Sequence, residues 1–135
     1  MERYQLLDHT ADMMIKAFGN TIEECFENAG FALFDQTVSL HNIRPLESKH
    51  VEVTGDDMED MLYAYLSELL FIEDCDNIIL CEFHVKIDGN KVICDAKGEL
   101  LNKQIHRCKS EIKAVTYHMM DINMEEPSVT VLFDV

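Results

Sequence analysis

The sequence predicts an α+β fold in which a largely antiparallel or mixed sheet packs with two main helices. Two segments carry apolar residues every three or four positions, as amphipathic helices do. About seven other segments are rich in β-branched and aromatic residues, and these strand-like segments alternate irregularly with the helical ones. A length of 135 residues fits one domain, residues 1–135, built around one core.

The beginning of the chain predicts two strands followed by a helix. Residues 3–7 and 13–18 mix apolar and polar side chains, and the small and polar residues between them are typical of a loop. We expect Asn20 to be the N-cap of the helix, because Glu23 stands in the capping-box position three residues later. Apolar residues at helical spacing continue this helix to about residue 36.

The second helix is expected to begin after Asp56, its predicted N-cap. Three acidic residues crowd its first turn, where negative charge meets the positive end of the helix dipole. The segment before it, residues 38–50, shows no periodicity and is interpreted as irregular apart from a short strand at 51–53.

The second half of the chain predicts strands. Residues 78–87 and 92–96 flank Asp-Gly-Asn at 88–90, a turn signal that indicates a hairpin. Residues 112–122 fit a long strand or a helix, with β-branched and aromatic residues favouring the strand. Residues 129–135 predict a final strand, and the pattern leaves the pairing order of the strands open.

The formal net charge is −15, from 26 acidic and 11 basic residues. Nucleic acids carry dense negative charge and are normally bound by Lys/Arg surfaces, so we expect no direct nucleic-acid binding. Acidity favours cations and basic protein surfaces instead. No apolar run is long enough to cross a bilayer and the first residues do not resemble a secretory signal, so no membrane association is expected.

The five cysteines indicate a reducing compartment. None of them stands at C-x-x-C spacing and their number is odd, so neither a zinc site nor a disulfide framework is expected. We expect buried, reduced thiols in a cytoplasmic protein, with the nucleus as a second compartment in a eukaryote. Cys25 fits this expectation, because it lies on the apolar side of the first predicted helix.

Two segments offer oxygen ligands to a hard cation. Residues 8–12, Asp-His-Thr-Ala-Asp, place two carboxylates in one loop, although such residues also cap turns very often. Asp134 and the terminal carboxylate of Val135 bring further negative charge to the end of the last strand, which is alternatively a frayed end. If that strand lies beside the loop, several oxygens converge on one ion.

A third segment, residues 111–118, carries Lys113 and His118, which suit an anion or an acidic partner. The pattern alone favours structural roles, with Lys113 pairing with a carboxylate and His118 filling a polar gap. The sequence contains no nucleophile elbow, phosphate loop, dinucleotide fingerprint or zinc motif. His106 and Cys108 combine a base with a thiol but lack an orienting group at a recognisable spacing.

Taken together, these segments resemble the archease family over nearly the whole chain. Any one of them alone is a weak signal, but their order in a chain of this length is specific. The matching segments are residues 8–12 (Asp-His-Thr-Ala-Asp), 19 and 21–24 (Gly, then Thr-Ile-Glu-Glu), 66–71 (Leu-Ser-Glu-Leu-Leu-Phe), 98–99 (Gly-Glu), 112–118 (Ile-Lys-Ala-Val-Thr-Tyr-His) and 133–135 (Phe-Asp-Val).

The resemblance implies a protein that assists an enzyme and is not an enzyme itself. It implies an activator of RtcB-type RNA ligases in tRNA splicing and RNA repair, which promotes guanylylation of the ligase and multiple turnover. It also implies an alternative, a chaperone-like modulator of a tRNA cytosine-5 methyltransferase. A stand-alone metal-dependent hydrolase is a third hypothesis, but the sequence shows acids without a convincing general base.

The resemblance also implies a metal site, usually described as calcium, on Asp12, Asp134 and the terminal oxygens of Val135. Other residues that match the family segments are expected to shape the loop, face the partner or support the metal ligands. They are Asp8, His9, Lys113, Thr116 and His118.

Overall fold

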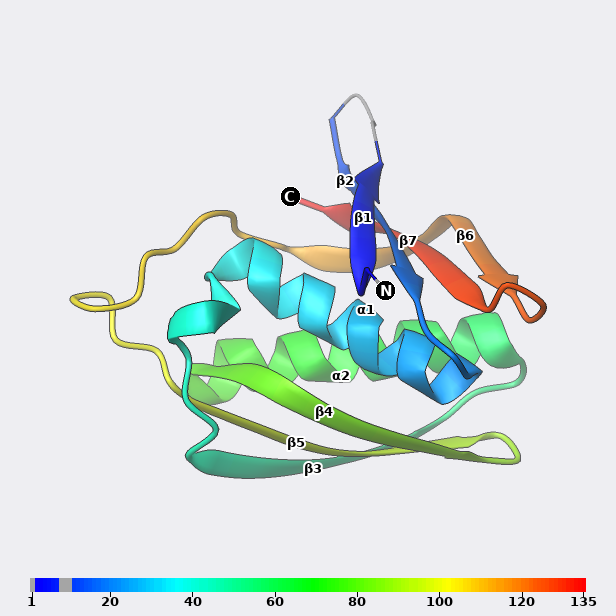
Figure 1. The fold of residues 1–135 in the computed structure, drawn as a ribbon, viewed down its shortest axis with the longest axis horizontal. Helices are drawn as coiled ribbons and strands as arrows, with labels where there is room; N and C mark the ends of the chain where they lie inside the picture. The colour runs from blue at the N-terminus through cyan, green and yellow to red at the C-terminus, as the bar shows by residue number, and fades with distance from the viewer. Residues whose placement is uncertain (1, 8–10) are drawn as a thin grey trace.

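The computed structural model describes residues 2–7 and 11–135, in which two antiparallel sheets enclose two helices (Figure 1). The first sheet has the order β1-β2-β7-β6, and the second has the order β3-β5-β4. The first sheet contains β1 (Tyr4–Leu7), β2 (Met13–Phe18), β7 (Ser128–Asp134) and β6 (Ala114–Asn123). The second contains β3 (Glu47–Thr54), β5 (Lys91–Leu100) and β4 (Ile78–Asp88).

The helices form the middle layer between the two sheets (Figure 1). Helix α1 (Ile22–Thr37) packs against β2 on one side and β4 on the other. Helix α2 (Met58–Asp76) packs against β6 and β3. The core therefore lies on both sides of the helices, with Phe26, Tyr65 and Phe133 among its largest fully buried side chains. The predicted α+β class with two main helices is confirmed, although the strands divide between two sheets.

Both helices begin one residue later than predicted. Thr21, not Asn20, caps α1, because its Oγ1 accepts the backbone N–H of Glu24 at 3.1 Å. Asp57, not Asp56, caps α2 in the same way. The residues predicted to be the caps are bound from the first turn of each helix. The carboxylate of Glu24 accepts the backbone N–H of Asn20, and the carboxylate of Asp60 accepts the backbone N–H of Asp56. Either of two adjacent polar residues can serve as the N-cap in the sequence. In the structure the second residue of each pair has the extended backbone that an N-cap requires.

Two strands are longer than the sequence predicts: β3, expected at residues 51–53, and β5, expected at residues 92–96. β3 begins at Glu47, inside the segment interpreted as irregular, and most of its side chains are exposed. It is an edge strand and buries few residues, so its sequence lacks a clear apolar alternation. A short 3₁₀ turn, Leu40–Asn42, precedes it. The predicted hairpin of β4 and β5 is confirmed, with Gly89 at positive φ in the turn, and residues 114–123 form a strand.

The prediction that the thiols are buried is only partly right. Cys25 and Cys94 are buried and Cys81 is partly buried, but Cys75 and Cys108 are exposed. Cys75 lies near the end of α2, and Cys108 lies in the connection between β5 and β6. All five cysteines are free thiols, as expected.

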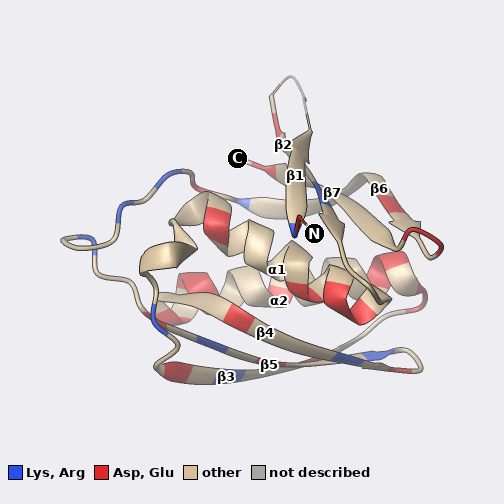
Figure 2. Cartoon of the chain, in the orientation of Figure 1, with Lys and Arg blue, Asp and Glu red and all other residues tan. Residues whose placement is uncertain are grey.

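The charged residues are unevenly distributed along the chain (Figure 2). Acidic residues are spread over both helices and the strands, whereas the connection between β5 and β6 is mainly basic. This connection, residues 101–113, carries four basic residues and one acidic residue, in a chain whose net charge is −15. Within the part of the chain that the structure describes, neither helix combines the length and the apolar character needed to cross a membrane.

Candidate functional site

The register of two strands brings Asp12 and Asp134 to the same end of the first sheet. Strands β2 and β7 pair antiparallel, with Met13 opposite Phe133. Asp12 immediately precedes Met13, and Asp134 immediately follows Phe133. Because the strands are antiparallel, both aspartates lie next to this pair, at the same end of the ladder. Opposed residues of an antiparallel pair project from the same face of the sheet. The end of the last strand therefore lies beside Asp12, as the metal hypothesis requires.

The beginning of β6 joins this end of the sheet. Ala114 pairs with Asp134, and the backbone N–H of Lys113 donates to the carbonyl oxygen of Asp134 at 2.7 Å. The chain end at Val135 is exposed beside them, and Figure 1 shows it near the start of β2. Three segments far apart in the sequence, containing residues 12, 113 and 134–135, therefore meet at one edge of the molecule.

The donors at this edge suit a hard cation in their chemistry. Asp12 is partly exposed and Asp134 is exposed, and both offer carboxylate oxygens of the kind that calcium prefers. Among residues 2–7 and 11–135, no three His, Cys, Asp or Glu side chains gather closely enough to hold a metal. Further oxygens would come from Val135, and Asp8 and His9, the other loop residues singled out, lie outside the described residues.

Thr116 and His118 have different environments on β6. The hydroxyl of Thr116 donates to the carbonyl oxygen of Leu132 on β7 at 3.1 Å, which ties the two strands together. The pairing of β6 with β7 is then interrupted between Thr116 and Asp121, and Met119 adopts a positive φ of 57°. This irregularity exposes His118, so it fills no buried polar gap.

Tyr117 connects the irregular part of β6 to helix α2. Its ring stacks on Tyr63 with centroids 4.1 Å apart, and its hydroxyl donates to the carboxylate of Asp60. This hydrogen bond raises the pKa of Tyr117 to about 12 and lowers the pKa of Asp60. The contact holds β6, which Lys113 immediately precedes, against the helix layer.

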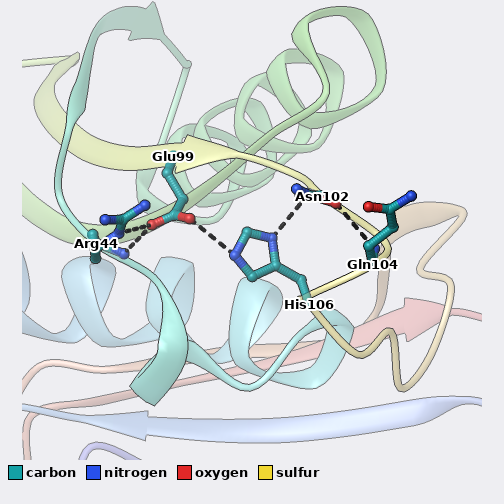
Figure 3. Close-up of polar contacts among 5 residues, drawn as sticks. All are labelled: Arg44, Glu99, Asn102, Gln104 and His106. Atoms are coloured by element: carbon teal, nitrogen blue, oxygen red, sulfur yellow. Dashed lines mark hydrogen bonds and ion pairs between the residues drawn. The ribbon is translucent and has the colours of Figure 1, made fainter.

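A second polar group lies where β5 leaves its sheet (Figure 3). The carboxylate of Glu99 accepts both the backbone N–H and the side-chain Nε of Arg44, at 2.7 and 3.1 Å. Its other oxygen lies 2.9 Å from Nε2 of the buried His106. Burial raises the pKa of Glu99, but the hydrogen bonds from Arg44 outweigh it and hold that pKa below its usual value.

The other ring nitrogen of His106 fixes the loop that follows β5. Nδ1 accepts the backbone N–H of Asn102 at 2.9 Å, so the neutral ring carries its hydrogen on Nε2, toward Glu99. Nε2 lies close to the Glu99 carboxylate but forms no hydrogen bond of good geometry among the described residues. The imidazole of His106 is buried, whereas Cys108 is exposed.

Two groups of interacting residues were not predicted from the sequence. The first is Tyr117 with Asp60. The second is Glu99 with Arg44 and His106. Their members are far apart in the chain, and no spacing rule links them. The signal that was available is the sequence Gly98-Glu99, since an acidic residue at the end of an apolar strand needs a partner once it is buried.

Comparison with known proteins identifies relatives over the whole chain. Residues 4–135 match the model of the archease protein family. The chain is 41% identical to the protein archease of Pyrococcus abyssi over 126 residues, which cover 90% of this chain and 89% of the relative. It is 39% identical to the protein archease of Methanothermobacter thermautotrophicus over 130 residues, covering 93% and 92% of the two chains.

Two solved structures share the fold. The solution structure of protein 1598 of Methanobacterium thermoautotrophicum matches with a TM-score of 0.85 and 33% identity, covering 100% of both chains. A crystal structure from Thermotoga maritima, of an archease described as a possible chaperone, matches with a TM-score of 0.64 and 23% identity. That likeness covers 96% of this chain and 94% of the other and concerns the fold alone.

Proposed function

Because the chain belongs to the archease protein family, we propose that it is a metal-binding protein cofactor that activates an RtcB-type RNA ligase. It acts in tRNA splicing and RNA repair in the cytoplasm. It promotes guanylylation of the ligase and allows multiple turnover, and it catalyses no reaction alone.

The observation that supports this proposal is the meeting of Asp12 and Asp134 at one end of the first sheet. Two carboxylates at neighbouring strand ends repel each other, and a cation between them removes that cost. Val135 supplies the remaining oxygens in this proposal, and Ca²⁺ suits such a set because it accepts carboxylates in irregular geometry. When bound, the ion supplies positive charge that attracts the phosphate groups of a nucleotide.

The other residues of the site hold the partner. Lys113 stands one residue before β6 and is exposed, so its ammonium is available to an acidic or phosphate group of the ligase. His118 is exposed on the irregular part of the same strand, and Thr116 holds that strand against β7. Asp8 and His9 lie outside the described residues, and we propose that they contact the partner or support the metal ligands.

The experiment that tests this proposal measures ligation by a cognate RtcB-type ligase, with GTP and Mn²⁺, in single and multiple turnover. We expect the wild-type protein to restore multiple turnover, and Asp12→Asn and Asp134→Asn to abolish that effect while the proteins stay folded. Asp88→Asn, in the exposed β4–β5 turn, is the matched control and keeps full activation. Wild-type activation by both site variants would refute the metal-site proposal.

A second candidate function is a chaperone-like role toward a tRNA cytosine-5 methyltransferase. The Thermotoga maritima relative described as a possible chaperone gives a reason to keep it. Pull-down with each enzyme separates the two roles, since only the true client is retained by this protein. Turnover of phosphoesters by the isolated protein with metal would instead point to a stand-alone hydrolase.

A further inference from the structure

A groove of about 500 Å³ lies beside the Glu99 group, where β5 ends and the chain turns toward β6. One wall is the segment before β3, with Arg44 and Leu46, and the other is the loop with Lys103 and Ile105. Leu100, at the end of β5, lies between them. None of these residues belongs to the site proposed for the metal, so the groove needs its own explanation.

The groove concentrates exposed aliphatic surface. Leu46, Leu100 and Ile105 are 62%, 58% and 64% exposed, and all three line it. Single exposed apolar residues are ordinary on a protein surface, but three converging on one hollow mark a binding surface. In free solution this surface is hydrated. Covering it with apolar groups of a partner releases that water, which favours binding.

The loop that presents Ile105 is held in place by the polar group of Figure 3. His106, next in the chain, is buried against Glu99 and accepts the N–H of Asn102, and the N–H groups of Ile105 and His106 both donate back to the carbonyl oxygen of Asn102. On the opposite wall, the N–H of Leu46 donates to Gly98 O at 2.9 Å. Both aliphatic walls are thus preorganised, which lowers the entropy cost of binding.

The loop that forms one wall of the groove is basic, in contrast to the acidic composition of the rest of the protein. Residues 103–109 carry three basic residues and no acidic one, of which Lys103 lines the groove, and the side chain of Arg44 is 68% exposed on the other wall. Glu99 is buried and binds Nε of Arg44, so Glu47 is the one exposed acidic residue among the described residues that line the groove. A partner for this groove carries negative charge beside an apolar group.

The partner chemistry that fits is protein and not nucleic acid. Binding of single-stranded RNA relies on aromatic side chains that stack with bases, and none of the described residues that line the groove is aromatic. Branched aliphatic side chains match leucine, isoleucine or valine of a peptide, while a guanidinium and an ammonium match its carboxylates.

We propose that this groove binds an acidic segment of a partner protein. A branched aliphatic side chain of that segment packs among Leu46, Leu100 and Ile105, and its flanking carboxylates meet Arg44 and Lys103. The interaction is separate from the metal end of the molecule and does not depend on Asp12 or Asp134.

The test uses the full chain and a fluorescein-labelled peptide of alternating Glu and Leu as the probe, followed by fluorescence anisotropy. We expect saturable binding that Ile105→Asp and Lys103→Glu each weaken by at least about tenfold. Met124→Asp and Lys86→Glu make the same chemical changes on exposed residues outside the groove and leave the affinity within about twofold. Thermal unfolding of each variant verifies the fold.

Three results would overturn the proposal. The first is the absence of saturable peptide binding, or equal loss of binding in the control variants. The second is binding of a labelled oligouridine RNA that the groove variants abolish, in place of peptide binding. The third is concentration-dependent self-association in sedimentation that Ile105→Asp removes, which would make a second copy of this chain the occupant.

Discussion

Glu73, near the C-terminal end of α2, has one carboxyl oxygen, Oε1, that is buried and lacks a hydrogen-bond partner among the described residues. Burial, with smaller effects of the charges on Asp74 and Glu111, raises the pKa of Glu73 to about 7. Its position at the negative end of the helix dipole also disfavours the ionised form. The ionised carboxylate therefore destabilises the folded protein at neutral pH.

Replacing this carboxyl by an amide should change stability in a pH-dependent way. The folded pKa of about 7 lies above the ordinary 4.5, so the folded state binds more protons between these values and its stability falls as pH rises through them. We expect Glu73→Gln to leave stability nearly unchanged near pH 4.5 and to raise it near pH 8 by at most about 3 kcal/mol. Urea unfolding at both pH values measures this effect.

The control for Glu73→Gln is Glu82→Gln on β4, an exposed carboxyl that makes the same chemical change. Its unfolding free energy should follow that of the wild type at every pH. A Glu73→Gln profile parallel to the wild type from about pH 4.5 to 8 would contradict a raised pKa at Glu73.

Individual residues were predicted best where a local rule applies. Asp12 and Asp134 could be selected because short polar motifs and strand ends are visible in the sequence, and their proximity then depended on one strand pairing. Glu99 and His106 could not, because their contact requires the loop after β5 to fold back, and nothing local encodes that path. Tyr117 falls in a segment for which a strand was favoured, but its hydrogen bond to Asp60 joins two residues that are 57 positions apart in the chain.

At the scale of elements, the pairing of β5 with β4 depends on Gly98. The ladder shifts register between Leu80 and Glu82, and this irregularity brings the β4 backbone unusually close to β5. A Cβ atom at Gly98 would lie 1.8 Å from the carbonyl oxygen of Ile79 and 2.6 Å from Cα of Leu80. Backbone atoms of a paired strand cannot move away without breaking the ladder.

We therefore expect Gly98→Ala to destabilise the protein strongly, by about 3 kcal/mol or more, because the added methyl overlaps backbone. Because Gly98 precedes Glu99 and bonds Leu46, the same variant should also weaken peptide binding in the groove. Denaturant unfolding measures the first effect and anisotropy the second.

Gly89→Ala is the comparison for Gly98→Ala. Gly89 has a φ of +61° in the β4–β5 turn, but no neighbouring atom of the described residues lies within 4 Å of the position that a Cβ would take. Its cost is conformational, about 1 kcal/mol. If the two variants lost equal stability, close backbone approach would not be the reason for glycine at 98.

Whole elements were predicted where burial imposes a pattern. Helices α1 and α2 lie between two sheets, so their apolar residues recur clearly, and only the choice between adjacent caps was wrong. β3 was mostly missed because an exposed edge strand has no such constraint. The division of the strands into two sheets was not predicted, since pairing depends on long-range contacts that a single strand does not specify.

For the whole molecule, the separation of charge suggests two ways of meeting partners. The acidic surface of a protein with net charge −15 attracts a basic partner over a long range, whereas the basic connection between β5 and β6 acts locally. The proposed ligase contact belongs to the first kind and the groove contact to the second. Their responses to salt and to single substitutions should therefore differ.

We expect the association rate of this protein with a cognate ligase to fall by about tenfold or more when ionic strength rises from about 0.05 to 0.5 M. The dissociation rate should change much less, because steering acts before contact. Stopped-flow fluorescence with a labelled ligase measures both rates. An association rate independent of salt would contradict electrostatic steering.

The Asp12→Asn variant separates steering from activation. It changes the net charge only from −15 to −14, so the salt dependence of its association rate should match that of the wild type while activation of the ligase is lost. Loss of association itself, at every ionic strength, would mean that Asp12 contributes to docking rather than to a metal site. Retained association with lost activation would place the function of Asp12 after the encounter, where a bound cation would act on the nucleotide.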